Sequence, residues 1–136
     1  MNLEWDESLS VGNDLIDADH QKLFEIINRL RSQDCESREA LTAILNELVD
    51  YSVYHFGREE ELMAKNGYTR LGKHQEEHGY FIAKVGGIGL QLERDPLDRV
   101  RNEASEFLSL WLSSHIRTSD KDYVMCLSGA PKKGTS

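Results

Sequence analysis

The middle of the chain carries two pairs of potential metal ligands separated by a turn signal. His55 and Glu59 are four residues apart, as are His74 and His78, and residues at this spacing lie on the same face of an α-helix. Between the pairs, Asn66-Gly67 is a helix stop and a turn signal. The sequence therefore predicts two antiparallel helices whose ligand pairs face each other.

Hydrophobic periodicity extends the helical pattern along most of the chain. Apolar residues recur at alternating spacings of three and four in four segments, at about residues 17–31, 37–65, 69–92 and 96–115. Ser37 is the expected N-cap of the second segment, and Pro96 stands at the start of the fourth. Residues 1–15 form a polar arm, for which we expect no helix. The fold class predicted from these residues is all-α.

Charge and composition exclude several classes of partner. Sixteen basic and 24 acidic residues give a net charge of −8, which disfavours nucleic acid and anionic lipid as partners. The chain start lacks the basic and apolar regions of a signal peptide, and no apolar run approaches the roughly 18 residues of a membrane span, so we expect a cytoplasmic protein. Cys35 and Cys126 form no metal-binding motif and are expected to be free thiols. Residues 1–126 are expected to be one domain, followed by a flexible C-terminal tail at residues 127–136.

All five histidines fall on the predicted inner faces of the helices: His20, His55, His74, His78 and His115. A single inward histidine is more often a hydrogen-bonded core residue, but five of them, with the inward Glu59, need partners that offset their desolvation. A metal centre supplies such partners. Imidazole and carboxylate without thiolate suit iron, manganese, zinc or copper. One tetrahedral zinc would leave donors unpaired, so a dinuclear centre is preferred.

The order of these residues resembles the hemerythrin family. The pattern is His20, then His55-x-x-x-Glu59, His74-x-x-x-His78 and His115-x-x-x-x-Asp120, and the flanking segments VGNDLIDADHQKLF, HFGREEELM, WLSSHI and DKDY resemble the bacterial branch. The similarity extends from about Trp5 to Tyr123. It implies an antiparallel up-down-up-down four-helix bundle with an N-terminal extended arm. It also implies a non-haem di-iron centre, with an oxo or hydroxo bridge, that binds O2 reversibly.

The resemblance also implies a role for each ligand. His74, His78 and His115 would hold one iron, and His20 and His55 the other, while Glu59 and Asp120 would bridge both. The iron with two histidines would keep an open position for O2. The residues that the family places around this position are all apolar: Leu23, Phe56, Trp111, Leu112 and Ile116. Ordinary core packing also explains an apolar residue at each of these positions, and both interpretations can hold.

Two features depart from the family pattern. Thr69 stands where many relatives have a proline after Tyr68, and the third helical segment contains the glycine-rich patch Gly86–Gly89. Glycine costs about 1 kcal/mol relative to alanine inside a helix, so this end of the segment is expected to fray, to bend or to pack close to a neighbour. Neither departure falls on a predicted ligand.

Three functions are consistent with the sequence. The first is reversible O2 binding for transport, storage or sensing, without enzymatic turnover. O2 is then the partner, and the sequence does not identify a protein partner. The second is a di-iron oxidoreductase that acts on peroxide, nitric oxide or ferrous iron. The third is a structural zinc or iron site that stabilises the bundle. The predicted apolar wall has no acid or base to drive turnover, and this favours the first.

Overall fold

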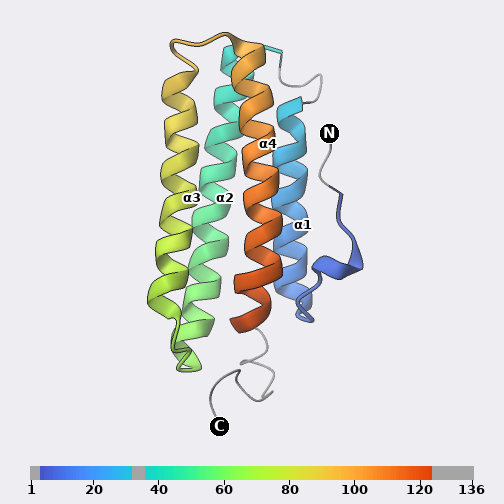
Figure 1. The fold of residues 1–136 in the computed structure, drawn as a ribbon, viewed down its shortest axis with the longest axis vertical. Coiled ribbons are helices and arrows are strands. Elements are labelled where there is room, and N and C mark those ends of the chain that lie inside the picture. Colours follow the sequence, from blue (N-terminus) through green and yellow to red (C-terminus); the bar gives the residue numbers. More distant parts are fainter. Residues whose placement is uncertain (1–3, 32–35, 124–136) are drawn as a thin grey trace.

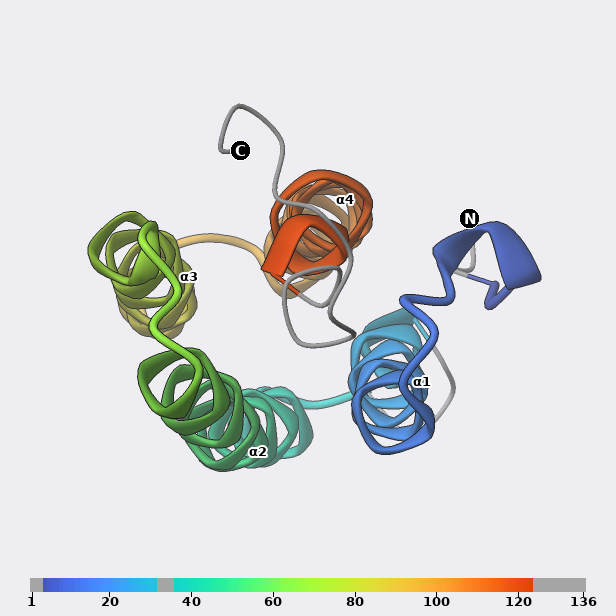
Figure 2. The same ribbon diagram turned by 90° about the horizontal axis from the view of Figure 1, so that it is seen from below.

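In the described part of the chain, four long α-helices form a bundle, each antiparallel to the one before it (Figure 1). The computed structural model describes residues 4–31 and 36–123. The helices are α1 (Asp14–Asn28), α2 (Arg38–Lys65), α3 (Leu71–Gln91) and α4 (Leu97–His115). Viewed along the bundle, they follow one another around a common core (Figure 2). The predicted all-α, four-helix fold is confirmed.

The N-terminal arm is more ordered than the sequence prediction allowed. It contains a short 3-10 helix, Glu7–Leu9, and α1 begins at Asp14 rather than near residue 17. The earlier start follows from a cap, because the Asn13 side chain accepts a hydrogen bond of 3.1 Å from the backbone N–H of Ile16. The arm is held to α1 by Trp5, whose ring meets the edge of Phe24 at a centroid distance of 5.7 Å.

The predicted turn between the second and third helices is present. Asn66 caps α2, and Gly67 adopts a φ of +65°, a left-handed conformation that glycine enters without steric cost. The backbone N–H of Tyr68 then donates to the carbonyl oxygen of Met63 at 3.0 Å, which satisfies an orphan carbonyl at the helix end. Thr69 lies in this turn, ahead of α3. The turn brings α2 and α3 side by side and antiparallel (Figures 1 and 2).

The glycine-rich end of α3 remains helical. The helix continues to Gln91, and a Cβ added at Gly86, Gly87 or Gly89 would meet no other atom within 4 Å. A close approach to a neighbouring helix therefore does not explain these glycines.

The end of the bundle opposite this turn is an ordinary apolar core. Leu30, Leu41 and Leu48 are completely buried, and each contributes roughly 2 kcal/mol by leaving water. At the other end of α2 the inward position is Met63, whereas the neighbouring Leu62 is half-buried. None of the described helices has the length and apolar character that a membrane crossing requires. Among the described residues, a cluster of buried ionisable side chains replaces the apolar core toward the α2–α3 turn.

Candidate metal centre

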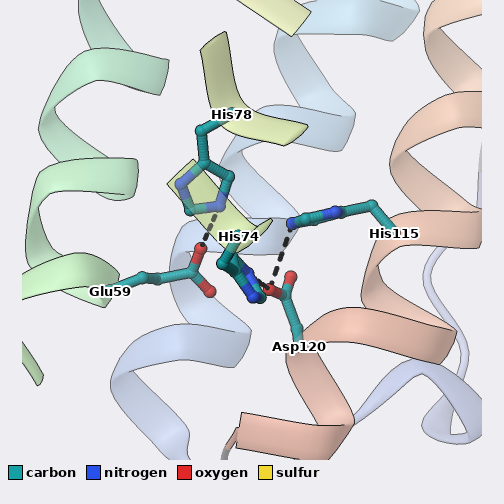
Figure 3. A group of neighbouring side chains, drawn as sticks. All are labelled: Glu59, His74, His78, His115 and Asp120. Atoms are coloured by element: carbon teal, nitrogen blue, oxygen red, sulfur yellow. Dashed lines mark hydrogen bonds and ion pairs between the residues drawn. The ribbon is translucent and has the colours of Figure 1, made fainter. Parts of the chain in front are cut away.

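Seven polar side chains from all four helices meet inside the lower half of the bundle. Each has at most 4% of its surface exposed. The periodicity placed the histidines and Glu59 inward, and the structure does the same. Figure 3 shows the five members that come from α2, α3 and the end of α4. The seven residues are His20 of α1, His55 and Glu59 of α2, His74 and His78 of α3, His115 of α4, and Asp120 beyond it.

Asp120 reaches the centre through a π-helical turn. Directly after α4 the chain continues as a π-helix, Ile116–Asp120, and the backbone N–H of Lys121 donates to the carbonyl oxygen of Ile116. In an α-helix, a residue five positions after His115 would be rotated by roughly 140° away from it. The wider π-turn brings Asp120 back to the inner face, and such turns are frequent at functional sites. The helical segment predicted at about residues 96–115 is thus followed directly by a π-helix that carries Asp120.

Three histidines form one group around the two carboxylates. The Nε2 atoms of His74 and His115 lie 2.8 and 3.2 Å from Oδ1 of Asp120. The Nε2 atom of His78 lies 3.3 Å from Oε1 of Glu59 (Figure 3). These five side chains each offer one donor atom, and all five atoms lie within 4.8 Å of one another. Such a cluster can hold one metal ion.

The other two histidines form a second group on the opposite side of the same carboxylates. The Nε2 atom of His20 lies 3.0 Å from Oδ2 of Asp120 and 3.7 Å from Oε2 of Glu59. The Nε2 atom of His55 lies 3.3 Å from Oε1 of Glu59. Asp120 thus turns one oxygen toward each group, and Glu59 contacts histidines of both. This arrangement suits two ions joined by carboxylates.

Unsatisfied donor atoms indicate that the pocket fits metal ions. The Nε2 atoms of His20, His55, His78 and His115 lie 3.0 to 3.3 Å from carboxylate oxygens of Asp120 and Glu59. Within the described part of the chain, however, these four nitrogens, Oε1 of Glu59 and Oδ2 of Asp120 make no hydrogen bond with suitable geometry. Buried polar atoms without partners cost free energy. Cations placed among them would satisfy these atoms together, and nitrogen with carboxylate oxygen is a donor set for iron, manganese, zinc or copper.

Carboxylates outside the centre orient three of the histidines. The Nδ1 atoms of His55, His78 and His115 each lie 2.8 to 2.9 Å from a carboxylate oxygen. Such contacts fix the tautomer and the ring orientation of a metal-binding histidine. Sequence reasoning missed these partners, since each is the direct neighbour of a predicted ligand and direct neighbours point to different faces of a helix. They are Asp19, Glu60 and Glu77, respectively.

Two tyrosine hydroxyl groups extend these contacts. Tyr123 donates a hydrogen bond of 2.6 Å to Oε2 of Glu59, and Tyr51 donates one of 2.8 Å to Oδ1 of Asp19. The sequence signal for Tyr123 was its position three residues after Asp120, one helical turn away. Each hydroxyl holds a carboxylate in place without adding charge to the centre.

Charge compensation sets the protonation of the centre without metal. Burial lowers the pKa of His55, but the charge of Glu59 and the contact with Asp19 outweigh it and raise this pKa to about 10. Burial and the nearby Asp120 raise the pKa of Glu59, yet His55 and His20 hold it well below its ordinary value. The pKa of Asp120 is likewise held low, against burial, by His115 and other histidines. Without metal, these shifts favour a charged His55 beside ionised Glu59 and Asp120.

The five predicted wall residues occupy two kinds of position. Leu23, Leu112 and Ile116 are completely or almost completely buried in the core. Phe56 stacks on His78, with ring centroids 3.8 Å apart and an interplanar angle of 4°, and Trp111 stacks on His115 at 4.6 Å and 11°.

Trp111 also borders water. It is half-buried and lines a surface cavity of about 320 Å³ together with polar side chains such as Lys73, Glu77 and Ser119. The cavity reaches His74 and His115, so it opens on the outer side of the three-histidine group.

The fold and the buried cluster define a four-helix bundle protein with a candidate non-haem, dinuclear metal centre. The family model described as hemerythrin HHE cation binding domain matches residues 11–127. The chain belongs to the hemerythrin family.

Individual relatives agree with this assignment. The chain is 35% identical to a bacteriohemerythrin of Stenotrophomonas maltophilia over 122 residues, which cover 89% of this chain and 78% of the relative. It is 32% identical to a bacteriohemerythrin of Clostridium acetobutylicum over 125 residues, covering 88% and 97% of the two chains. A crystal structure of wild-type hemerythrin superposes with a TM-score of 0.78 at 27% identity, covering 92% of this chain and 97% of that one. A hemerythrin point mutant superposes with a TM-score of 0.80 at the same identity, covering 94% and 99%.

Proposed function

We propose that this protein binds O2 reversibly at a non-haem di-iron centre and so carries, stores or senses O2. The observation that supports this most directly is the convergence of seven buried donor side chains, most of them with donor atoms that lack a hydrogen-bond partner within the described residues. Two iron ions held there would supply both the open coordination position and the electrons that O2 binding requires. Membership of the hemerythrin family supports iron over the other metals that the donor set accepts.

The two groups of histidines have unequal numbers of donors, and this gives the proposed centre its open position. His74, His78 and His115 would hold one iron, and His20 and His55 the other. Glu59 and Asp120, which face both groups, would bridge the two ions. The iron with fewer histidines is then the one with room for a small molecule.

The surroundings of the two-histidine group favour binding over turnover. Leu23 lies one helical turn after His20 and is fully buried, as is Ile116. Neither side chain can donate or accept a proton, and their burial keeps water from the bound molecule. A di-iron oxidoreductase would need a proton source at this position, and none of the five wall residues provides one.

A single experiment tests the proposal. The iron-loaded protein is reduced without air, O2 is admitted and then removed, and the visible spectrum is followed throughout. We expect a charge-transfer band that appears with O2 and disappears when O2 is removed, together with about two irons per chain. A colourless zinc protein, or a band that persists after O2 removal while peroxide or nitric oxide is consumed, would contradict it.

A further inference from the structure

One polar residue interrupts the apolar layer next to the two-histidine group. Four buried residues lie three positions from a histidine of the centre: Leu23, Ser52, Phe81 and Leu112. In α1 and α3 they follow the histidine, and in α2 and α4 they precede it. Because the helices alternate in direction (Figure 1), all four lie toward the same end of the bundle. They form a layer one helical turn beyond the centre, which we call the covering layer.

Ser52 lies on the side of the covering layer that belongs to the open position. The two helices that carry His20 and His55 contribute Leu23 and Ser52, respectively. Leu23 is completely apolar, whereas Ser52 brings a hydroxyl group, and its side chain has 0% of its surface exposed. The wall predicted from the family was apolar throughout, whereas Ser52 adds a hydrogen-bonding hydroxyl group to it.

The Ser52 hydroxyl has no hydrogen-bond partner within residues 4–31 and 36–123. Serine and threonine in a helix commonly donate to the carbonyl oxygen four residues earlier. Ser113 does so at 2.9 Å and Thr118 at 2.8 Å in this chain, but Ser52 does not. An unpaired buried hydroxyl is destabilising, and it remains available to a molecule that enters the layer.

We propose that the Ser52 hydroxyl donates a hydrogen bond to the small molecule that binds beside His20 and His55. This inference rests on the proposed di-iron centre and adds to it a residue that selects ligands. The hydroxyl favours a ligand of two or three atoms whose outer atom is electron-rich and accepts a hydrogen bond. Small anions meet this description better than apolar gases of the same size.

Azide is a suitable probe because it is a three-atom anion with an accepting outer nitrogen. Its affinity for the oxidised, iron-loaded full chain is measured by titration in the visible spectrum. We expect Ser52→Ala and Ser52→Val to weaken azide binding by about fivefold to tenfold, the typical value of one hydrogen bond. Threonine has the shape of valine but keeps the hydroxyl of serine. Ser52→Thr should therefore have an azide affinity within about twofold of the parent.

Two further readouts separate this role from a structural one. The antisymmetric stretch of bound azide in the infrared should shift in Ser52→Ala and Ser52→Val but not in Ser52→Thr. In the metal-free protein, Ser52→Ala should leave the free energy of unfolding equal or higher, because the hydroxyl has no protein partner. Ser105→Ala is the matched control, since Ser105 is also buried but lies ten residues before His115.

Equal azide affinity for the parent and for Ser52→Ala would overturn the inference, and so would threonine and valine variants that weaken binding equally. The proposed function is judged separately by O2. A parent that binds azide through Ser52 but does not release O2 supports the inference and contradicts reversible O2 binding. If the parent releases O2 but substitutions at Ser52 leave the azide affinity unchanged, reversible O2 binding is supported and the role of Ser52 is contradicted.

Discussion

The two halves of the centre are supported in different ways. In the three-histidine half, His78 and His115 contact Glu60 and Glu77, and each of these carboxylate side chains is 28% exposed. In the two-histidine half, His55 contacts Asp19, which is only 7% exposed, and Nδ1 of His20 has no partner among the described residues. One half is thus oriented from the surface of the bundle, and the other from its interior.

This difference in burial agrees with the proposed roles of the two halves, one that only holds its ion and one that also binds a small molecule. The surface cavity borders the three-histidine half, for which we propose a full set of ligands around its ion. In the half proposed to hold the open position, Leu23 lies one helical turn after His20 and is completely buried. Burial is therefore greatest where a bound molecule must be kept from water.

The strongest test of the comparison is to remove a carboxylate that both halves share. We expect Glu59→Ala and Asp120→Ala each to lose at least one of two irons, because a bridging carboxylate serves both ions. Iron per chain is measured after purification and desalting. Glu61→Ala, at an exposed position of the same helix, should keep both irons. Full iron and an unchanged spectrum in Glu59→Ala would show that this carboxylate does not bridge.

Removing the metal should destabilise the protein as a whole. Metal affinity contributes to folding free energy when the ligands are buried, and several kcal/mol corresponds to a fall in melting temperature on the order of 10 °C for a chain of this size. Thermal melts of the metal-free and iron-loaded forms at one pH measure the fall. Identical melting temperatures would mean that the buried donors do not need a cation.

The outer carboxylates should differ in importance between the halves. We expect Asp19→Asn to weaken metal binding at the two-histidine half by about tenfold or more, because no water can replace a partner that is nearly buried. Glu60→Gln should have a smaller effect, since solvent reaches that side of His78. The variants are compared by titrating the metal-loaded protein with a chelator. The amount of metal removed is measured separately for the tightly and the weakly bound ion. Equal losses would remove the proposed distinction between interior and surface support.

The pH dependence of the metal-free protein tests the same distinction. The pKa of His55 is raised from 6.5 to about 10 in the folded protein, so its stabilising contribution is complete below about pH 6.5 and is lost as pH rises through 10. Asp19→Asn replaces the carboxylate whose hydrogen bond helps to raise this pKa, so the loss of stability should move to lower pH. Glu77→Gln should leave the His55 transition in place. Melting temperatures of metal-free variants between pH 6 and pH 10.5 measure the shift, and a flat profile for the parent would contradict the assignment.

Much of the fold and of the inner cluster follows from local patterns in the sequence. The spacing of His55 to Glu59 and of His74 to His78 is a helical spacing, so periodicity alone places these donors on inner faces. Asn66-Gly67 specifies the turn through the left-handed conformation of Gly67. Such features can be predicted from a few neighbouring residues, without the rest of the chain.

Other parts of the site depend on geometry that periodicity does not carry. Asp120 is inward only because α4 passes into a π-helix, and the five-residue spacing looks wrong for an α-helix. Asp19 and Glu77 point sideways from their helices and meet histidines of other helices, so only tertiary packing reveals them. Ser52 stands three residues before His55, a spacing that lies on one helix face, but its lack of a hydrogen-bond partner among the described residues appears only in the folded structure.

The smallest effect is expected from the wall of the two-histidine half. Leu23 is fully buried one turn after His20, and it can be changed without removing a ligand. We expect Leu23→Asn to keep two irons but to shorten the life of the oxygenated form several-fold, because an amide holds water beside the bound molecule. Autoxidation is followed in the visible spectrum, with Leu23→Met as a control of similar volume. If Leu23→Asn binds and releases O2 with unaltered autoxidation, the interior of this half does not protect the bound molecule by excluding water, and burial there serves packing alone.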